Sequence, residues 1–75
     1  MIKFISPDGQ VQTSNEMLTM TKIERFVGEN FDFHKLKSDD VLIHSPGGDH
    51  NEHVSTVANF KVQGNAIICS EEDIA

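Results

Sequence analysis

The residues best suited to chemistry lie in one segment, His44-Ser45-Pro46-Gly47-Gly48-Asp49-His50-Asn51-Glu52-His53. Imidazole and carboxylate groups bind zinc, nickel or iron, and one helical turn would aim His50 and His53 at one ion. Asp49, Glu52 or His44 would complete the site. The spacing matches no well-defined metal motif, and its Pro-Gly-Gly run is typical of a mobile loop. A divalent metal site on His44, His50 and His53 and a polar loop without any cofactor both stay open.

The same histidines do not by themselves indicate an enzyme. An imidazole near its ordinary pKa can act as a general base, but nucleophilic catalysis also needs Cys69 or a serine within reach. Cys69 falls in an apolar stretch, where a thiol is a buried hydrophobe with a raised pKa. Ser45 lacks the flanks of a nucleophile elbow, and no phosphate-binding loop, GxGxxG or HExxH motif occurs. We therefore expect a non-enzymatic protein.

Carboxylates form the second candidate site. The chain has 12 acidic and six basic residues, a formal charge of −6. Acidic side chains at two strand ends would align as a phosphate-like row if those ends lie side by side, as in proteins that imitate nucleic acid. A solvated turn and a fraying tail are the alternative. With two acidic residues of the histidine-rich segment added, the predicted partner-binding residues are Asp39, Asp40, Asp49, Glu52, Glu71, Glu72 and Asp73.

This charge favours positively charged partners, among them the basic grooves of nucleic-acid-binding proteins, or metal cations. Direct binding of nucleic acid or of an anionic membrane is disfavoured, because both need clustered lysine and arginine. The longest apolar run is Ala66–Cys69, whereas a bilayer span needs about 20 residues. The first residues lack the apolar region of a signal peptide. We expect a cytoplasmic protein.

Seventy-five residues with 37% hydrophobic side chains predict one domain over residues 1–75. Met1–Ile5 and Gln10–Gln12 read as a hairpin joined by the turn at Ser6–Gly9. Thr13 as N-cap and Glu16 as its capping-box partner predict a helix that runs to Val27 and stops at Gly28. The helical stripe comprises Met17, Met20, Ile23, Phe26 and Val27.

A second hairpin is predicted from Phe31–Leu36 and Val41–His44, with Phe31 and Phe33 packed against the helix. The β-branched content of residues 50–64 favours an irregular or extended segment over a helix. Ala66–Cys69 should be a central strand covered on both faces. The expected architecture is α+β, in two layers, with one amphipathic helix on a mostly antiparallel sheet of four to five strands. A homodimer is expected, formed either by edge-to-edge pairing of the sheet or by burial of Leu18, which lies off the helical stripe.

The order of the predicted elements is familiar, and four segments match those of a known family: Phe26-Val27-Gly28, Val41-Leu42-Ile43, Asn51 and Gly64-Asn65-Ala66-Ile67-Ile68. In these positions the chain resembles a family of short domains of unknown function carried by phages and mobile elements. It departs from that family after the second hairpin, where Glu52–Phe60 replaces a leucine- and proline-rich segment. The resemblance implies an accessory protein acting inside a bacterial host cell by blocking a host or defence component, and it carries over no catalytic residue.

Three functions are therefore expected from the sequence. The first is an acidic, phage-type inhibitor that binds a host or defence protein. The second is a small-molecule or nucleotide-binding module, whose pocket would lie at an oligomer interface because so small a core can hardly enclose one. The third is a histidine-rich metal-binding protein.

Overall fold

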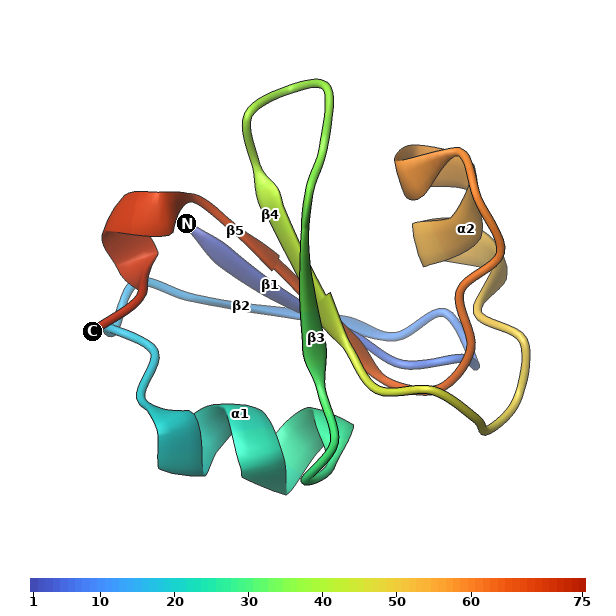
Figure 1. Ribbon diagram of the computed structural model, residues 1–75, viewed down its shortest axis with the longest axis horizontal. Helices are drawn as coiled ribbons and strands as arrows, with labels where there is room; N and C mark the ends of the chain where they lie inside the picture. Colours follow the sequence, from blue (N-terminus) through green and yellow to red (C-terminus); the bar gives the residue numbers. More distant parts are fainter.

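A five-stranded antiparallel sheet forms the centre of the structure, a computed structural model that describes residues 1–75 (Figure 1). The strand order is β2-β1-β5-β4-β3, and every neighbouring pair is antiparallel. The strands are β1 Ile2–Ile5, β2 Val11–Ser14, β3 Asp32–Lys35, β4 Val41–His44 and β5 Ala66–Cys69. The predicted central position of Ala66–Cys69 is confirmed, and all four of its residues are buried.

Two helices cover the two faces of this sheet, so the predicted arrangement of one helix in two layers is wrong in that respect. Helix α1 (Met20–Val27) packs on one face and helix α2 (Glu52–Ala58) lies on the other, as Figure 1 shows. A short 3₁₀ helix, η1 (Glu71–Asp73), follows β5. The α+β class and the antiparallel five-stranded sheet are confirmed. Because each strand alternates its side chains, the sheet feeds a separate apolar cluster on each face.

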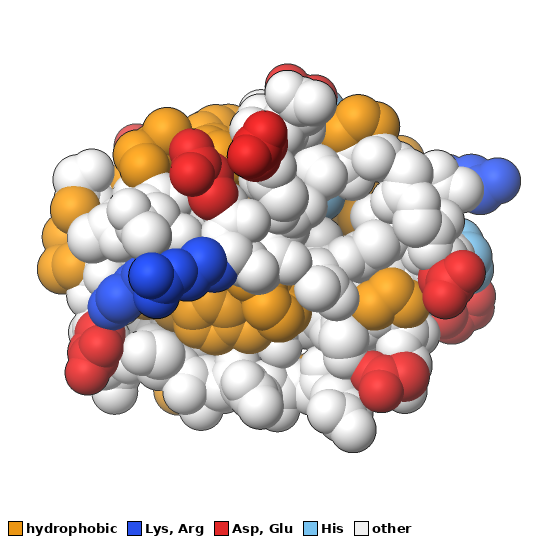
Figure 2. Space-filling model, turned by 90° about the horizontal axis from the view of Figure 1, so that it is seen from below, with side chains coloured by type: hydrophobic (Ala, Val, Ile, Leu, Met, Phe, Trp, Pro, Cys, Tyr) orange, Lys and Arg blue, Asp and Glu red, His pale blue; other side chains and the backbone are white.

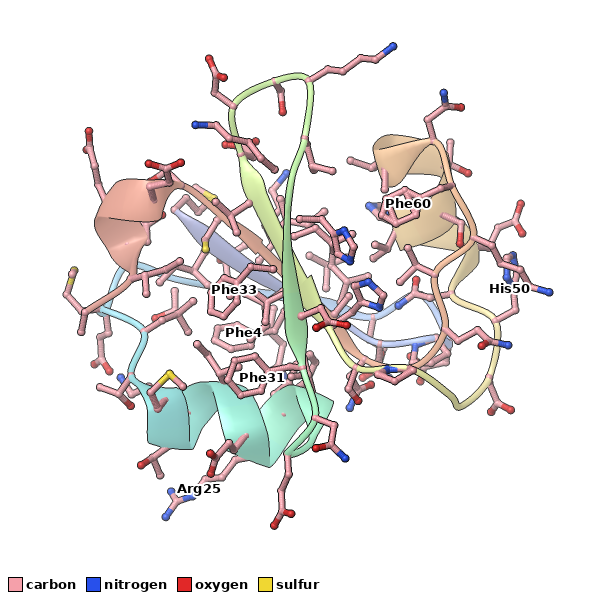
Figure 3. All side chains as sticks on the ribbon, in the orientation of Figure 1. Phe4, Arg25, Phe31, Phe33, His50 and Phe60 are labelled. Carbon is pink, nitrogen blue, oxygen red and sulfur yellow. The ribbon has the colours of Figure 1, made fainter.

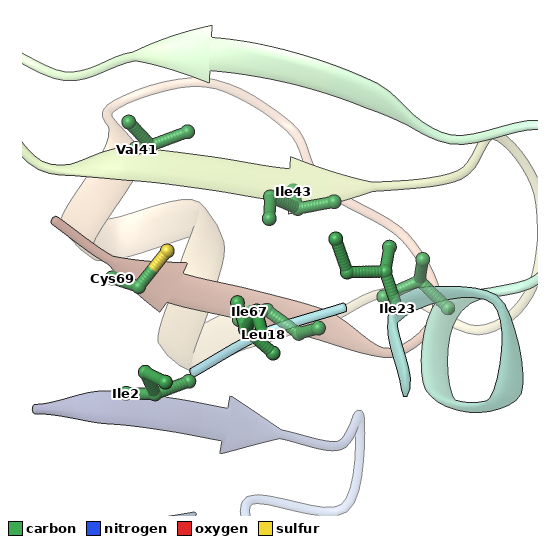
Figure 4. Packing of buried hydrophobic residues seen from close by; sticks show 8 residues of the cluster. Ile2, Leu18, Ile23, Val41, Ile43, Ile67 and Cys69 are labelled. Atoms are coloured by element: carbon green, nitrogen blue, oxygen red, sulfur yellow. The ribbon is translucent and has the colours of Figure 1, made fainter. Parts of the chain in front are cut away.

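The cluster on the α1 face joins the sheet, the helix and the segment before it (Figure 4). Its buried members are Ile2, Leu18, Ile23, Val27, Val41, Ile43, Ile67 and Cys69. Leu18 is fully buried and pairs with Ile74 in an isolated parallel bridge. The backbone N–H of Leu18 donates to the Asp73 carbonyl at 2.7 Å. The prediction that Leu18 is free to contact a second copy is therefore wrong, because this chain's own C-terminus covers it.

Helix α1 begins six residues later than the sequence predicts. Its N-cap is Thr19, whose hydroxyl accepts a hydrogen bond from the Lys22 N–H at 3.3 Å. Thr13 instead lies in β2 opposite Lys3, so the predicted capping box of Thr13 and Glu16 does not form. Pairing of β2 with β1 satisfies these backbone groups by sheet hydrogen bonds, which exclude a helical start there. Only Ile23 and Val27 of the predicted stripe are buried within the helix, and both methionines of that stripe are exposed.

Helix α2 lies where an extended segment was expected, and this prediction is wrong. Asn51 caps the helix by accepting from the Val54 N–H at 3.2 Å, and Asn59 ends it with a left-handed φ of 63°. The cluster on this face comprises Ile5, Leu42, Val54, Val62, Ala66 and Ile68. Asparagine is favoured both as an N-cap and in the left-handed conformation. These two caps outweigh the low helix propensity of the β-branched residues between them.

The edge strand β3 is exposed along its whole length. Phe31, just before it, packs against the α1-face cluster as predicted, whereas 47% of the Phe33 surface stays accessible. Their rings meet edge to face at 5.5 Å between centroids. The prediction that both phenyl rings pack against the helix is therefore confirmed for Phe31 and wrong for Phe33. The sheet ends at β3, and no further element covers its outer edge.

Candidate functional site

Four of the predicted partner-binding carboxylates gather at one end of the sheet. Strands β4 and β5 pair with Val41 opposite Cys69, so the turn before β4 lies beside the segment after β5. Between them is a shallow depression of about 440 Å³ with no hydrophobic lining. Its lining residues are Lys35, Ser38, Asp39, Asp40, Ser70, Glu71 and Glu72. We call Asp39, Asp40, Glu71 and Glu72 the acidic end.

Three carboxylates of the acidic end have no cationic partner. The only ion pair in the depression joins the Lys35 ammonium to Glu71 at 2.7 Å, and it raises the pKa of Lys35 and lowers that of Glu71. The ion pairs of the structure do not include Asp39, Asp40 or Glu72. Asp39 and Glu72 are exposed and Asp40 is half-buried. This leaves uncompensated negative charge at the surface, available to a cationic partner.

Asp73 belongs to the fold and is not an exposed member of the acidic row. Its carboxylate accepts hydrogen bonds from the Ser70 N–H at 3.0 Å and from the Ser70 hydroxyl at 2.9 Å. It also lies 3.6 Å from the N-terminal ammonium, and its side chain is 19% accessible. The hydrogen bonds from Ser70 lower the pKa of Asp73. The carboxylate thus caps η1, and we expect it to contribute little to partner binding.

Asp49 and Glu52 do not line the depression of the acidic end. They flank the start of α2, where the Glu52 carboxylate lies 3.0 Å from the His50 ring (Figure 3 labels His50). A carboxylate in the first turn of a helix is favoured by the unpaired N–H groups there. The seven predicted partner-binding residues therefore divide into the acidic end, the two acids beside α2, and the structural Asp73.

The three predicted metal ligands lie in different surroundings. His44 is stacked with His34, with ring centroids 4.9 Å apart, and Phe60 lies 6.3 Å from it. Both ring nitrogens of His44 are buried without a hydrogen-bond partner, and burial lowers its pKa. His50 pairs with Glu52, and His53 is exposed on α2. No group of three or more potential ligands is arranged to hold a metal ion.

Cys69 is buried at 2% exposure, as the apolar stretch predicts. Burial raises the pKa of its thiol to about 11. The reactive form of cysteine is the thiolate, which is scarce at neutral pH with such a pKa. Nucleophilic chemistry at Cys69 is therefore disfavoured by its environment.

Sequence reasoning missed a groove between α1 and the β1–β2 hairpin. A depression of about 300 Å³ is lined by Phe4, Gln12, Lys22, Arg25 and Phe26. Figure 2 shows this face, where Lys and Arg side chains border an apolar surface. Lys22 and Arg25 are three residues apart in the sequence. Their position next to Phe26, with Phe4 on the first strand, was the available signal. We call this site the aromatic groove.

Comparisons of the chain with protein-family models, with curated proteins and with solved structures found no match. The resemblance to short phage and mobile-element domains therefore stays a hypothesis. Neither helix of the structure has the length and apolar character needed to cross a bilayer.

Proposed function

We propose that this chain is a non-enzymatic binding protein whose acidic end docks on a basic surface of another protein. The observation that carries the proposal is the convergence of Asp39, Asp40, Glu71 and Glu72 on one depression, with three of these carboxylates lacking a cationic partner. The antiparallel register of β4 and β5 holds the two acidic segments together. Fixed, clustered charge steers association and selects a complementary partner.

The partner class follows from the chemistry of the acidic end. A row of carboxylates offers only hydrogen-bond acceptors and negative charge, as a nucleic-acid backbone does. Lysine and arginine side chains in a nucleic-acid-binding groove are the natural complement. The phage-type inhibitor of a host or defence protein, acting in a bacterial cytoplasm, is the form of this proposal that the sequence resemblance favours.

Affinity capture with charge variants tests the proposal. A tagged chain is incubated with bacterial lysate, and bound proteins are identified at low and high salt. The test variant carries D39N, D40N, E71Q and E72Q, and the matched control carries E24Q, E29Q, D49N and E52Q, so both lose the same charge. We expect one basic partner, lost in the test variant, retained by the control and weakened by salt. Equal loss in both variants, or a partner retained by the test variant, would contradict it.

A further inference from the structure

The aromatic groove combines an aromatic wall with a cationic rim, which is unusual on a chain with a net charge of −6. Phe4 on β1 and Phe26 on α1 meet at 5.2 Å between centroids, with ring planes at 86°. Both rings are half-buried and line the groove. Such a perpendicular pair forms a corner, in which a third flat ring can stack on one face and meet the other ring by its edge.

The rim supplies cations from one helix. Lys22 and Arg25 stand three residues apart on α1 and both line the groove. The Lys22 ammonium forms an ion pair with the Glu16 carboxylate at 3.1 Å, whereas Arg25 takes part in no ion pair of the structure. A free guanidinium presents a planar fork of donors that suits a phosphate group. Arg25 is therefore the stronger anion contact and Lys22 the weaker one.

The other end of the groove offers polar side chains. A second depression of about 150 Å³ shares Phe4, Gln12 and Phe26 with the first, and Ser6, Gln10 and Asn65 complete its lining. Asn65 also donates from its amide nitrogen to the Phe26 carbonyl at 2.9 Å, which fastens the turn before β5 to the end of α1. Carboxamides carry both donors and acceptors, as the edges of nucleobases do.

We propose that the aromatic groove binds a mononucleotide, with its base against Phe4 and Phe26 and its phosphate at Arg25 and Lys22. A volume of about 300 Å³ lies at the lower end of small-molecule sites. Stacking on aromatic side chains serves any base, and the carboxamides add contacts to the base edge. A longer polyanion would extend beyond these two cations over a surface of net charge −6, so a single nucleotide is favoured over a strand. The groove belongs to one chain, unlike the interface pocket expected from the sequence.

Titration of the ¹⁵N-labelled chain with adenosine 5′-monophosphate, followed by NMR, tests this proposal. We expect saturable shifts at the side-chain amides of Gln12 and Asn65 and at the Arg25 Nε–H. Adenosine alone and inorganic phosphate alone should each bind about tenfold more weakly, since each supplies only part of the contacts. The proposal would be overturned by shifts scattered over the surface or by equal affinity for adenosine. It would also be overturned if the shifts do not saturate at about 10 mM nucleotide, about the weakest binding that titration resolves.

Matched variants locate the site. Arg25→Gln should weaken nucleotide binding about tenfold, whereas Lys61→Gln, with the same change of charge on the exposed Lys61, should leave it within about twofold. Phe26→Leu should weaken the nucleotide without changing the affinity for inorganic phosphate. Equal effects of Arg25→Gln and Lys61→Gln would mean that only net charge is sensed and would overturn the site. Neutralising the acidic end should not abolish nucleotide binding, so this proposal fails or stands separately from partner docking.

Discussion

The two faces of the sheet are closed by different means. The core of the α1 face consists of apolar side chains, among them Ile23 and Leu18, which are fully buried. The α2 face has a polar anchor, Asn51, which is also fully buried. Its amide nitrogen donates to the Ile5 carbonyl at 3.2 Å and the Gly64 carbonyl at 2.9 Å, and its amide oxygen caps α2.

This difference bears on where the proposed binding surfaces lie. On the α2 side, polar residues of the histidine-rich segment are used to build the fold: Asn51 holds three backbone groups and His44 lies under aromatic rings. On the α1 side apolar residues fill the core, and Lys22 and Arg25 of the helix line the aromatic groove. Residue types suited to chemistry therefore also serve the fold in this molecule.

Replacing Asn51 with leucine should cause the largest loss of stability. The change leaves the Ile5 and Gly64 carbonyls and the Val54 N–H buried without their partner, and each such group costs about 1–3 kcal/mol. We expect a loss of about 4 kcal/mol in the free energy of unfolding in urea. Asn15→Leu, at an exposed position, is the control and should change it by less than about 0.5 kcal/mol. A loss below 1 kcal/mol (about one ordinary hydrogen bond) would show that Asn51 is no anchor.

Truncating Ile23 should give a smaller and graded loss on the opposite face. Ile23 is fully buried among aliphatic groups, so the cost should follow the volume removed. We expect about 3 kcal/mol for Ile23→Ala and about 1 kcal/mol for Ile23→Val, measured by the same urea titration. Equal costs for the two variants would contradict closure of this face by packing alone.

As the pH is lowered, the stability of the fold should fall through His44, on the α2 side of the sheet, at a higher pH than that at which carboxylates become protonated. Burial and the neighbouring His34 lower the pKa of His44 below its usual 6.5, while Asp32 opposes them. The folded chain thus holds His44 neutral where the unfolded chain takes up a proton, so stability falls as pH drops below about 6.5. His44→Phe should remove this part of the pH dependence between about pH 7 and 5.5, the range that spans the ordinary histidine pKa. His53→Gln, an exposed control, should not; an unchanged slope in His44→Phe would contradict the assignment.

Metal ions should have the smallest effect. His44 is covered by His34 and Phe60, and His50 pairs with Glu52, so the histidine-rich segment presents no convergent ligands. We expect equimolar zinc to leave the unfolding temperature unchanged, since a bound metal would raise it by mass action. Stoichiometric zinc that survives dialysis and is lost in the His50→Ala, His53→Ala variant would contradict this expectation and support the metal-binding hypothesis.

Strands were predictable from the sequence where one physical signal dominated. Ala66–Cys69 and Val41–Ile43 are uninterrupted apolar runs, and both are buried, in β5 and β4. Thr13 was expected to cap α1, but it pairs with Lys3 in the sheet, and the N-cap is Thr19. Tertiary contacts decide such a choice, and local pattern does not contain them. In α2 the β-branched residues suggested extended chain, whereas the helical spacing of Val54, Val57 and Ala58 and the flanking asparagines are consistent with the observed helix.

The candidate sites also differ in how far the sequence could predict them. Juxtaposition of Asp40 with Glu71 depends on the antiparallel pairing of β4 with β5, and the sequence could give this neighbourhood of the strand ends only as a condition. The Asp73 carboxylate is held by Ser70 because residues 71–73 form a short 3₁₀ helix. The run of three acidic residues did not predict this helix. The aromatic groove depends on the angle between α1 and the first hairpin, which brings Phe4 to Phe26. No periodicity within either segment encodes that contact.

Docking through the acidic end is tested most directly by titrating the ¹⁵N-labelled chain with a purified lysine- and arginine-rich peptide. Backbone amide shifts at Asp39, Asp40, Glu71 and Glu72 should saturate together and disappear at high salt. Glu24, Glu29, Asp49 and Glu52, which carry the same charge elsewhere, should shift little. Shifts spread evenly over both sets of carboxylates would show that only net charge attracts the peptide, and would contradict a defined binding surface.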